Sequence, residues 1–589
     1  MRGAMARFAG ARRQGFLGGD LPTPVQPGRG AINRGAIDRG GASLAADVRP
    51  RPQGWHFKTP GLLFSKACPS ADLGDLRSSR HPAAQGTAGT RAICNEHSAW
   101  EAGWGVRPEA DYSVSYALGM TLANAKIVAT LGPASDSPEL VTELIRAGAR
   151  VFRLNASHGV WAQHQKRIET IRAVEAALDT PVAILLDLQG PKIRLGRFAG
   201  GKCVLQTGNR FRITTEEILG DDTQASTTYS LFASDVRTGD RVLLNDGAVT
   251  LRAVANDGVA VDFEIVSGGV AGDQKGINLP GVKVSAPSMT EKDIEDLAAG
   301  LRAGVDFVAL SFVRSANDIR ELLERMGPVR IPVIAKIEKP EAVTNIQEIL
   351  DVASGIMVAR GDLGVEMSLE MVPPIQKMLI TEARKRNRFV ITATQMLESM
   401  IENSNPTRAE VSDVANAVYD GSDAVMLSAE TSVGKHPVAA VAYMTKIALE
   451  AERGLAASGE TRSAPTADLS DSGIVAEAAF VAAHAAGVKA IVVFTEGGYS
   501  ARLISRLRPQ MPVIAMSTSL DIVRRLRINY GVRPVLAPVV ETTDEMLGQM
   551  DTLLPALGLL HSGDKVVFVA GTPIGHSGST NLIKLHQVS

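Results

Sequence analysis

The sequence predicts an α/β protein: a (β/α)8 TIM barrel with an inserted small β-barrel lid domain and a C-terminal α/β domain. Two observations predict the barrel. Eight short β-branched runs recur from Lys126 onward, and amphipathic helical segments separate them, a pattern that gives a closed parallel sheet. A third observation predicts the insertion, because one gap between runs holds about a hundred residues of short alternating segments.

The eight predicted barrel strands share β-branched and aliphatic side chains and are flanked by turn residues. They are 126–132, 149–157, 182–190, 307–312, 332–338, 355–364, 389–395 and 423–430. Several intervening segments begin after Ser or Thr and end at Gly, as capped helices do. We therefore expect the barrel to occupy residues 120–192 and 284–455.

The long gap, residues 195–289, contains alternating apolar and polar residues punctuated by NDG and GG turns. We expect an all-β lid domain over 193–283. Loops of this kind lie at the C-terminal face of a barrel, where barrel active sites lie.

After the barrel, residues 454–473 form a linker rich in Ser, Thr and Ala, and a second α/β pattern follows. We expect a C-terminal domain over 470–589 with a mostly parallel sheet. Its Gly-rich segment 495–502 fits an ordinary βα turn, which the local pattern favours, or a phosphate-binding turn.

The first 119 residues differ in composition from the rest of the chain, since they are rich in Gly, Pro and Arg. Their apolar residues show no sustained helical or strand periodicity. We expect a disordered N-terminal extension. Four arginines and no acid in the first nineteen residues leave an organellar targeting segment open as an alternative. The interpretation we favour is an upstream extension, with Met120 as the natural start.

Composition excludes several classes of protein. The three cysteines form no CxxC pair, which argues against a disulfide framework or a structural zinc site. No apolar stretch is long enough to span a bilayer. The chain after residue 118 carries more acidic than basic residues, so its charge does not favour nucleic-acid binding.

Charged and polar side chains gather where the predicted strands end. Lys336 and Glu338 stand two residues apart in one strand and so share a face. Each such residue alone is usually a cap or a surface ion pair. Together they predict one site at the C-terminal end of the barrel, formed by Arg153, Asn155, Ser157, Asp187, Lys336, Glu338, Asp362 and Thr394.

The residue types indicate phosphoryl transfer. Glu338 and Asp362 offer hard oxygen ligands for Mg²⁺, while Lys336 and Arg153 offer positive charge to an anion. The chain contains no GxxxxGK[ST] loop and no GxGxxG in a βαβ context. A P-loop, a Rossmann site and a protein-kinase site are therefore excluded.

These residues lie in segments that together resemble pyruvate kinase, in order from about residue 122 to 589: KIVATLGPAS, RLNASHG, VIAKIEKPEAV, GIMVARGDLGVE, TATQMLESM, PTRAEVSDVANAVYDGSDAVMLSAET and GSTN. The resemblance implies transfer of the phosphoryl group of phosphoenolpyruvate to ADP, giving pyruvate and ATP, the final step of glycolysis. It implies Mg²⁺ or Mn²⁺ as cofactor, a cytoplasmic homotetramer, and a sugar-phosphate or nucleotide effector at the C-terminal domain.

The resemblance also implies residue roles. Glu338 and Asp362 match the Mg²⁺ ligands. The catalytic residues would be Lys336, Arg153, Thr394, Ser428 and Glu430; the substrate contacts Arg153, Lys336, Gly361, Asp362 and Thr394; and the nucleotide contacts Asn155, His158, Arg194 and Arg241, the last in place of a more usual lysine.

The monovalent-cation site departs from the family pattern. Asn155, Ser157, Asp187 and Leu188 match the potassium site, but LDLQGPKIR stands where potassium-requiring members resemble LDTKGPEIR. Lys192 thus replaces a glutamate. A lysine ammonium is close to potassium in size and charge. We hypothesise that Lys192 takes the place of potassium; the alternative is that it points to solvent.

Two competing functions make different demands on the sequence. A non-catalytic scaffold would require loss of Lys336, Glu338, Asp362 or Arg153, and all four are present. A Mg²⁺-dependent aldolase or lyase acting on phosphoenolpyruvate or pyruvate would lack the β insertion and the C-terminal domain.

Overall fold

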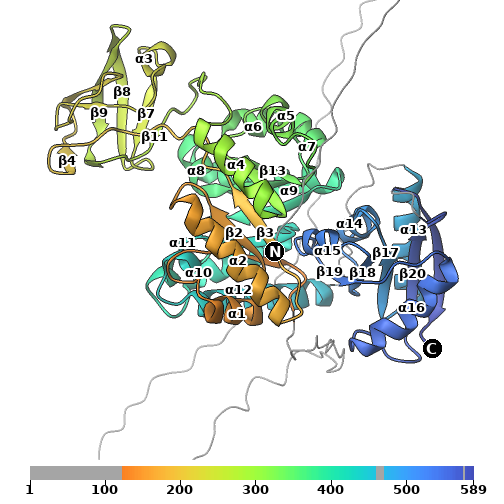
Figure 1. Ribbon diagram of the computed structural model, residues 1–589. Helices are drawn as coiled ribbons and strands as arrows, with labels where there is room; N and C mark the ends of the chain where they lie inside the picture. Colours follow the sequence, from red (N-terminus) through yellow and green to blue (C-terminus); the bar gives the residue numbers. More distant parts are fainter. Residues whose placement is uncertain (1–121, 459–469, 575–577) are drawn as a thin grey trace, which may run out of the picture. The chain divides into compact units, whose positions relative to one another are not determined.

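The computed structural model describes residues 122–458, 470–574 and 578–589 (Figure 1). The expected N-terminal extension, residues 1–119, lies outside the described residues, as does most of the expected linker.

Eight parallel strands close into a barrel, as predicted. Its first and last strands pair in parallel, with Lys126 opposite Ala424. The strands are β1 (Lys126–Thr130), β2 (Ala149–Asn155), β3 (Ala183–Asp187), β12 (Phe307–Leu310), β13 (Val333–Ile337), β14 (Gly355–Ala359), β15 (Phe389–Ala393) and β16 (Ala424–Leu427).

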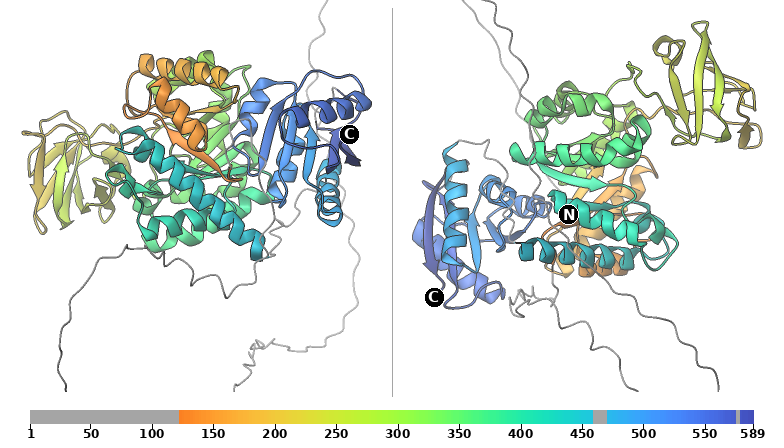
Figure 2. Two further views of the ribbon diagram at one scale, coloured as in Figure 1. Left: turned by 90° about the horizontal axis from the view of Figure 1, so that it is seen from below. Right: turned by 180° about the vertical axis from the view of Figure 1, so that it is seen from behind.

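Apolar side chains on both faces of these strands explain why they form. One set, including Val128, Leu185, Ile334 and Met357, fills the barrel interior. A larger set packs against the surrounding helices, which ring the barrel in both views of Figure 2. The cylinder is therefore a packed core, and polar chemistry is confined to its ends.

The barrel helices begin and end at the signals expected from the sequence. Thr290 and Thr407 each form a capping box, and Gly304 and Gly421 end the same helices in the left-handed conformation. The helices are α1 (Pro138–Ala147), α2 (Trp161–Ala177), α4 (Glu291–Ala303), α5 (Ala316–Arg325), α6 (Pro340–Thr344), α7 (Ile346–Val352), α8 (Arg360–Glu366), α9 (Val372–Lys385), α10 (Arg408–Asp420), α11 (Ala429–Ser432) and α12 (Pro437–Ser458), with short 3₁₀ turns at Leu369–Met371 and Glu398–Ile401.

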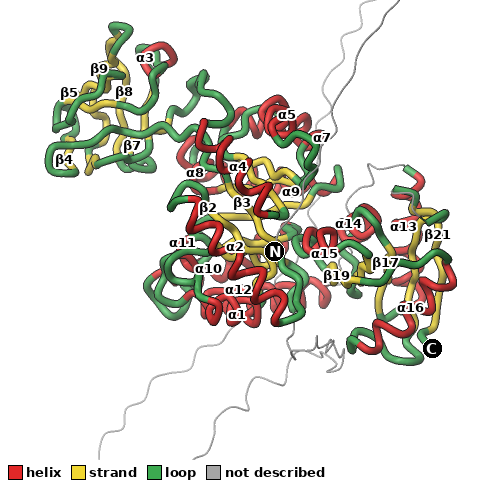
Figure 3. Tube along the Cα trace, viewed as in Figure 1, coloured by secondary structure: helices red, strands yellow, loops and turns green. Residues whose placement is uncertain are grey.

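The insertion is a β domain with one short helix, α3 (Phe232–Asp235), as Figure 3 shows. Its six-stranded sheet has the order β11-β7-β8-β9-β5-β6, and β10 pairs with β4. The Asn245-Asp246-Gly247 turn joins β7 to β8 with positive φ at all three residues. The strands are β4 (Lys202–Leu205), β5 (Arg210–Thr214), β6 (Gln224–Ser226), β7 (Arg241–Leu244), β8 (Val249–Asn256), β9 (Ala260–Ser267), β10 (Gly269–Gly272) and β11 (Ile277–Asn278).

The C-terminal domain is a five-stranded sheet of order β19-β18-β17-β20-β21, in which only β21 runs antiparallel to its neighbour. The mostly parallel sheet was expected, but β21 was not. The elements are α13 (Asp471–Ala486), β17 (Ala490–Phe494), α14 (Tyr499–Arg506), β18 (Val513–Ser517), α15 (Leu520–Leu526), β19 (Val532–Leu536), α16 (Thr543–Ala556), β20 (Lys565–Gly571) and β21 (Thr580–Gln587).

Several boundaries differ from those expected, since most of the observed strands end earlier than the expected runs. The chain turns into α8 at Arg360 and into α11 at Ala429, inside the runs expected as strands. Helix α12 continues to Ser458, past the expected end of the barrel at 455. Among the residues that the structure describes, no helix combines the length and apolar character needed to cross a bilayer.

Candidate active site

Lys336 lies at the centre of a buried ionic network at the C-terminal ends of the barrel strands. Its ammonium is 3.0 Å from Glu338 Oε1 and 3.3 Å from Asp187 Oδ1, and it donates a hydrogen bond of 2.7 Å to Ser311 Oγ. Burial alone would lower the pKa of Lys336. The charges of Asp187 and Glu338 outweigh that effect and raise the pKa, so the ammonium stays charged.

Arg153 holds the other side of Asp187. Its Nε donates to Asp187 Oδ2 at 2.7 Å, and its Nη1 donates to Thr130 Oγ1 at 3.1 Å. Burial opposes ionisation of Asp187, but the neighbouring Lys336 and Arg153 hold its pKa below the usual value. Asp187 is therefore a carboxylate that fixes two cations, although the resemblance assigned it to a monovalent-cation site.

Glu338 directly follows β13, and Asp362 lies in the first turn of α8, which follows the neighbouring strand β14. Glu338 is almost fully buried and its Oε2 accepts the backbone N–H of Phe312 at 2.7 Å. Burial raises the pKa of Glu338; the charge of Lys336 opposes this rise and the charge of Asp362 adds to it. Each carboxylate oxygen has a second lone pair, so both groups can still bind a Mg²⁺ ion that takes its other ligands from water and substrate.

Lys192 lies beside this pair of carboxylates. Its ammonium is 3.7 Å from Asp362 Oδ1, and both side chains are about a quarter exposed. The side chain thus turns toward the site, although its ion-pair partner is Asp362 and not Asp187.

The remaining residues matched to the monovalent-cation site make local contacts. Asn155 Oδ1 accepts the backbone N–H of Ser157 at 3.2 Å, and the carbonyl of Leu188 accepts the Ser311 hydroxyl at 2.7 Å.

Thr394 meets the loop of Gly361 and Asp362. Its Oγ1 accepts the backbone N–H of Gly361 at 2.8 Å, which joins the ends of β14 and β15. Thr394 has φ of +70°, a conformation that is rare for a β-branched residue.

Ser428 and Glu430 form a separate cluster after β16. Glu430 is fully buried, and its carboxylate accepts the backbone N–H groups of Ser428 at 2.6 Å and Leu397 at 3.1 Å. Burial raises the pKa of Glu430. The structure thus assigns Glu430 a bond to the loop after β15, which also carries Thr394.

The predicted nucleotide contacts form a less compact group. Burial lowers the pKa of His158, and the charges of Arg194, Arg153 and Lys192 lower it further. Arg194 Nη1 donates to the carbonyl of Gln274 at 3.0 Å, where the lid begins. Arg241 is the exposed first residue of β7 in the lid sheet.

Sequence reasoning missed Ser311. It directly follows β12, within the predicted strand run 307–312 and at the same barrel end as the selected residues, and it contacts Lys336 directly. Its position after Leu310 was the available signal, but a single serine at the end of a strand is most often a cap.

Comparison with known proteins is consistent with this geometry. A family model described as "Pyruvate kinase, barrel domain" matches residues 122–441, and one described as "Pyruvate kinase, alpha/beta domain" matches residues 474–586. A pyruvate kinase of Mycobacterium intracellulare is 47% identical over 466 residues, covering 79% of this chain and 98% of that protein. A pyruvate kinase of Geobacillus stearothermophilus is 45% identical over 473 residues, covering 79% and 80%.

Among solved structures, a pyruvate kinase from Cryptosporidium parvum is similar with a TM-score of 0.73 and 34% identity. The match covers 79% of this chain and 96% of that one. Both parts of the described chain, barrel and C-terminal domain, are thus accounted for by one family, and the chain belongs to the pyruvate kinase family.

Proposed function

We propose that this protein transfers the phosphoryl group of phosphoenolpyruvate to ADP, giving pyruvate and ATP, in the last step of glycolysis. The observation that carries the proposal is the ionic network of Lys336, Glu338, Asp187 and Arg153 at the mouth of the barrel. Phosphoryl transfer needs positioned cations more than covalent chemistry, because charge spreads over the oxygens in flight.

Each residue of this network has a role that its contacts support. Lys336 keeps its proton and points its ammonium at the transferring phosphoryl oxygens. Arg153, fixed by Asp187 and Thr130, contacts the substrate phosphate. The backbone N–H of Asp362 binds the substrate, as does that of Gly361 when it turns from Thr394 Oγ1, its acceptor in this structure. The hydroxyl of Thr394 lies beside the carbon that becomes the methyl group of pyruvate.

Glu338 and Asp362 would hold Mg²⁺ or Mn²⁺, which supplies a Lewis acid and neutralises phosphate charge when bound. Ser428 and Glu430 belong to the path that delivers the proton to the enolate. Their contact with Leu397 supports this role, because it ties the loop after β16 to the loop of Thr394. Asn155, His158, Arg194 and, from the lid, Arg241 contact the nucleotide.

Coupled measurement of ATP formation from phosphoenolpyruvate and ADP tests the function. We expect activity in the wild type, and loss of at least a thousandfold in kcat for Lys336→Met, because ~4 kcal/mol of charge stabilisation is a thousandfold in rate. Lys435→Met is the matched control, since the Lys435 side chain is 65% exposed and, within the described part of the chain, its ion-pair partner is Glu402. Absence of ATP formation by the wild type with Mg²⁺ would refute the proposal.

We propose further that Lys192 replaces potassium. Its ammonium lies at the mouth of the barrel, 3.7 Å from Asp362, where a monovalent charge would assist the same phosphates. Rates measured in sodium-free and potassium-free buffer should stay within about twofold of those with added potassium. A large stimulation by potassium would exclude this role.

The C-terminal domain is proposed to bind a sugar phosphate or nucleotide effector. The support is a cavity of about 120 Å³ at the Gly-rich segment 495–502, lined also by Ser517, Thr518 and Thr580. Gly498 donates its backbone N–H to Thr495 Oγ1 at 3.0 Å, which shapes the turn. Isothermal titration with panels of sugar phosphates and nucleotides tests this site.

A homotetramer in the cytoplasm is proposed on family membership. Sedimentation velocity tests the assembly, and fractionation of cells tests the compartment. We propose that the barrel domain comprises residues 120–192 and 284–455, the lid domain residues 193–283, and the C-terminal domain residues 470–589.

A further inference from the structure

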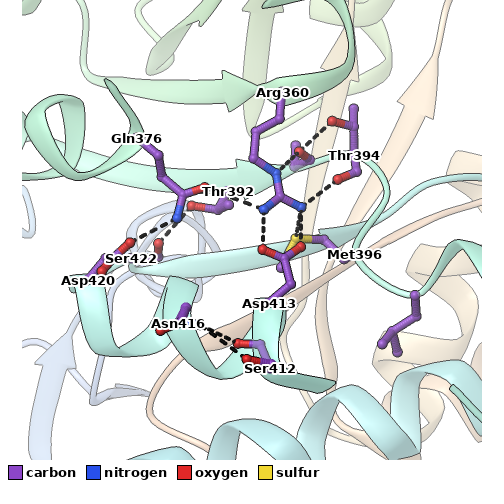
Figure 4. Close-up of polar contacts among 12 residues, drawn as sticks. Arg360, Gln376, Thr392, Thr394, Met396, Ser412, Asp413, Asn416, Asp420 and Ser422 are labelled. Carbon is purple, nitrogen blue, oxygen red and sulfur yellow. Dashed lines mark hydrogen bonds and ion pairs between the residues drawn. The ribbon is translucent and has the colours of Figure 1, made fainter. Parts of the chain in front are cut away.

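Arg360 precedes Gly361 and Asp362 directly, yet its side chain is engaged elsewhere. Its guanidinium faces Asp413 of α10 in a two-pronged ion pair, with Nη1 2.6 Å from Oδ1 and Nη2 2.7 Å from Oδ2 (Figure 4). Only 11% of the Arg360 side chain is exposed. Such a fork fixes both the position and the plane of the guanidinium.

The rest of the guanidinium binds the loop after β15. Nη2 donates to the carbonyl of Thr394 at 2.7 Å, and Nε donates to the carbonyl of Ala393 at 3.2 Å. Figure 4 shows the guanidinium between Asp413 and Thr394. One cation therefore connects the two loops that carry Asp362 and Thr394.

Thr394 is held in a strained conformation. Its φ is +70° and that of Gln395 is +52°, so two consecutive residues other than glycine adopt the left-handed region. Such a residue is strained and persists only where the surroundings fix it. Arg360 binds the carbonyls of Ala393 and Thr394, and these two hydrogen bonds hold the backbone on either side of the Thr394 Cα.

The hydroxyl of Thr394 is set by the same arrangement. It accepts the N–H of Gly361 at 2.8 Å and donates to the carbonyl of Ala393 at 2.6 Å. The Nε of Arg360 thus fixes the carbonyl of Ala393, which accepts the Thr394 hydroxyl. Arg360 also fixes the N–H of Gly361, which donates to that hydroxyl, because Gly361 is the next residue in the chain.

Helix α10 provides a firm anchor for the pair. The helix begins with the capping box of Thr407 and Glu410, and Gln376 Nε2 donates to Asp420 at its other end at 2.9 Å. A weaker bond of 3.4 Å runs from Arg360 Nη1 to Gln376 Oε1.

We propose that Arg360 and Asp413 are a positioning pair that sets the hydroxyl of Thr394 and the amide of Gly361 against the substrate. The proposal rests on the proposed function, because Thr394 is the group through which the pair acts. The Arg360 guanidinium is occupied by Asp413 and by the carbonyls of Ala393 and Thr394, so it acts through the groups that it positions. The competing possibility is that the ion pair stabilises the packing of α8 against α10 and has no effect on Thr394.

The decisive variant is Asp413→Asn, which keeps the shape of the side chain and removes its charge. We expect kcat to fall at least tenfold while the KM for phosphoenolpyruvate changes less than threefold. Asp413→Glu, which restores the carboxylate, should recover part of kcat. The matched control is Glu382→Gln, which breaks an arginine pair of 3.0 Å with Arg386 elsewhere in the barrel and should leave kcat unchanged.

A double-mutant cycle with Thr394→Val distinguishes an ion pair that positions Thr394 from one that only stabilises the packing of α8 against α10. If the pair acts through Thr394, adding Asp413→Asn to Thr394→Val costs little further kcat. Additive losses, or a kcat for Asp413→Asn within twofold of the wild type, would overturn the proposal. Should Asp413→Asn fail to fold, Arg360→Lys, which keeps the charge and loses the fork, takes its place in the same cycle.

Failure of this inference is distinguishable from failure of the function. An active wild type with unaffected variants rejects the positioning pair alone. An inactive wild type rejects the function, and a crystal structure of Asp413→Asn then tests the pair: retention of the positive φ at Thr394 contradicts it, and relaxation of the loop supports it.

Discussion

The ammonium of Lys336 donates to the hydroxyl of Ser311 at 2.7 Å, and that hydroxyl donates to the carbonyl of Leu188 at 2.7 Å. Ser311 therefore orients Lys336 by accepting its hydrogen bond, while the hydroxyl proton of Ser311 is donated to Leu188. We predict that Ser311→Ala lowers kcat by about 10-fold to 100-fold, because a hydrogen bond to a charged group contributes about 1.5–3 kcal/mol. Steady-state kinetics with phosphoenolpyruvate and ADP measures the loss.

Ser404→Ala is the control for this variant. Ser404 is exposed and accepts a hydrogen bond only from its neighbour Asn405 among the contacts described, so kcat should not change. Equal kcat for Ser311→Ala and the wild type would contradict an orienting role for Ser311.

The barrel could be predicted because its strands are buried on both faces. Runs such as Val333–Ile337 are therefore continuous apolar sequences that stand out from the helical segments. Strand β21 carried no such signal. It is an edge strand whose residues from Asn581 to Gln587 are mostly exposed or half-exposed, so burial imposed no apolar pattern on it.

The same distinction applies to the site. Lys336 and Glu338 could be paired from sequence because residues two apart in a strand share a face. Arg360 and Asp413 are joined only by packing between α8 and α10, fifty-three positions apart. Ser311 and Phe312 likewise contact the site through the closed barrel, and no local pattern encodes those contacts.

The position of Lys192 predicts a switch in cation dependence. Lys192→Glu would place a carboxylate near Asp362, where the ammonium now lies at 3.7 Å. We expect the variant to lose at least tenfold in rate without potassium and to recover part of it when potassium is added, because a cation would then be needed between the acids and the phosphates. Lys202→Glu, at an exposed lid position, is the matched charge change and should behave as the wild type. Potassium-independent activity of Lys192→Glu would count against the proposal.

A pair of glycines predicts opposite effects on stability. A Cβ on Gly355 in β14 would lie 2.4 Å from Cε2 of Phe389, inside the packed barrel. Gly355→Ala should lower stability by about 1–3 kcal/mol through overpacking. Gly548 of α16 has no atom within 4 Å of such a Cβ, so Gly548→Ala should raise stability by about 0.5–1 kcal/mol. Scanning calorimetry of both variants checks the signs; a barrel that accepts Gly355→Ala without a lower transition temperature would contradict the tight contact with Phe389.

Glu452 predicts a pH dependence of stability. Its carboxyl accepts the backbone N–H groups of Asn124 at 3.0 Å and Ala125 at 2.7 Å, and burial raises its pKa from 4.5 to about 7. Between these values the folded protein retains a proton that the unfolded chain has released, so stability falls as pH rises through this window, by at most about 1.4 kcal/mol per pH unit. Glu452→Gln removes that dependence.

The transition temperature of Glu452→Gln, measured relative to the wild type, should therefore increase from pH 5 to pH 8. Burial lowers the pKa of nearby Lys126 to about 7, so its contribution increases with pH above that value; it is present in both proteins and largely cancels in the difference. Glu450→Gln, on the exposed side of α12, should show a difference that does not change with pH. A constant difference for Glu452→Gln as well would mean that its carboxyl titrates alike in the folded and unfolded chains, because only a group whose pKa changes on folding couples stability to pH.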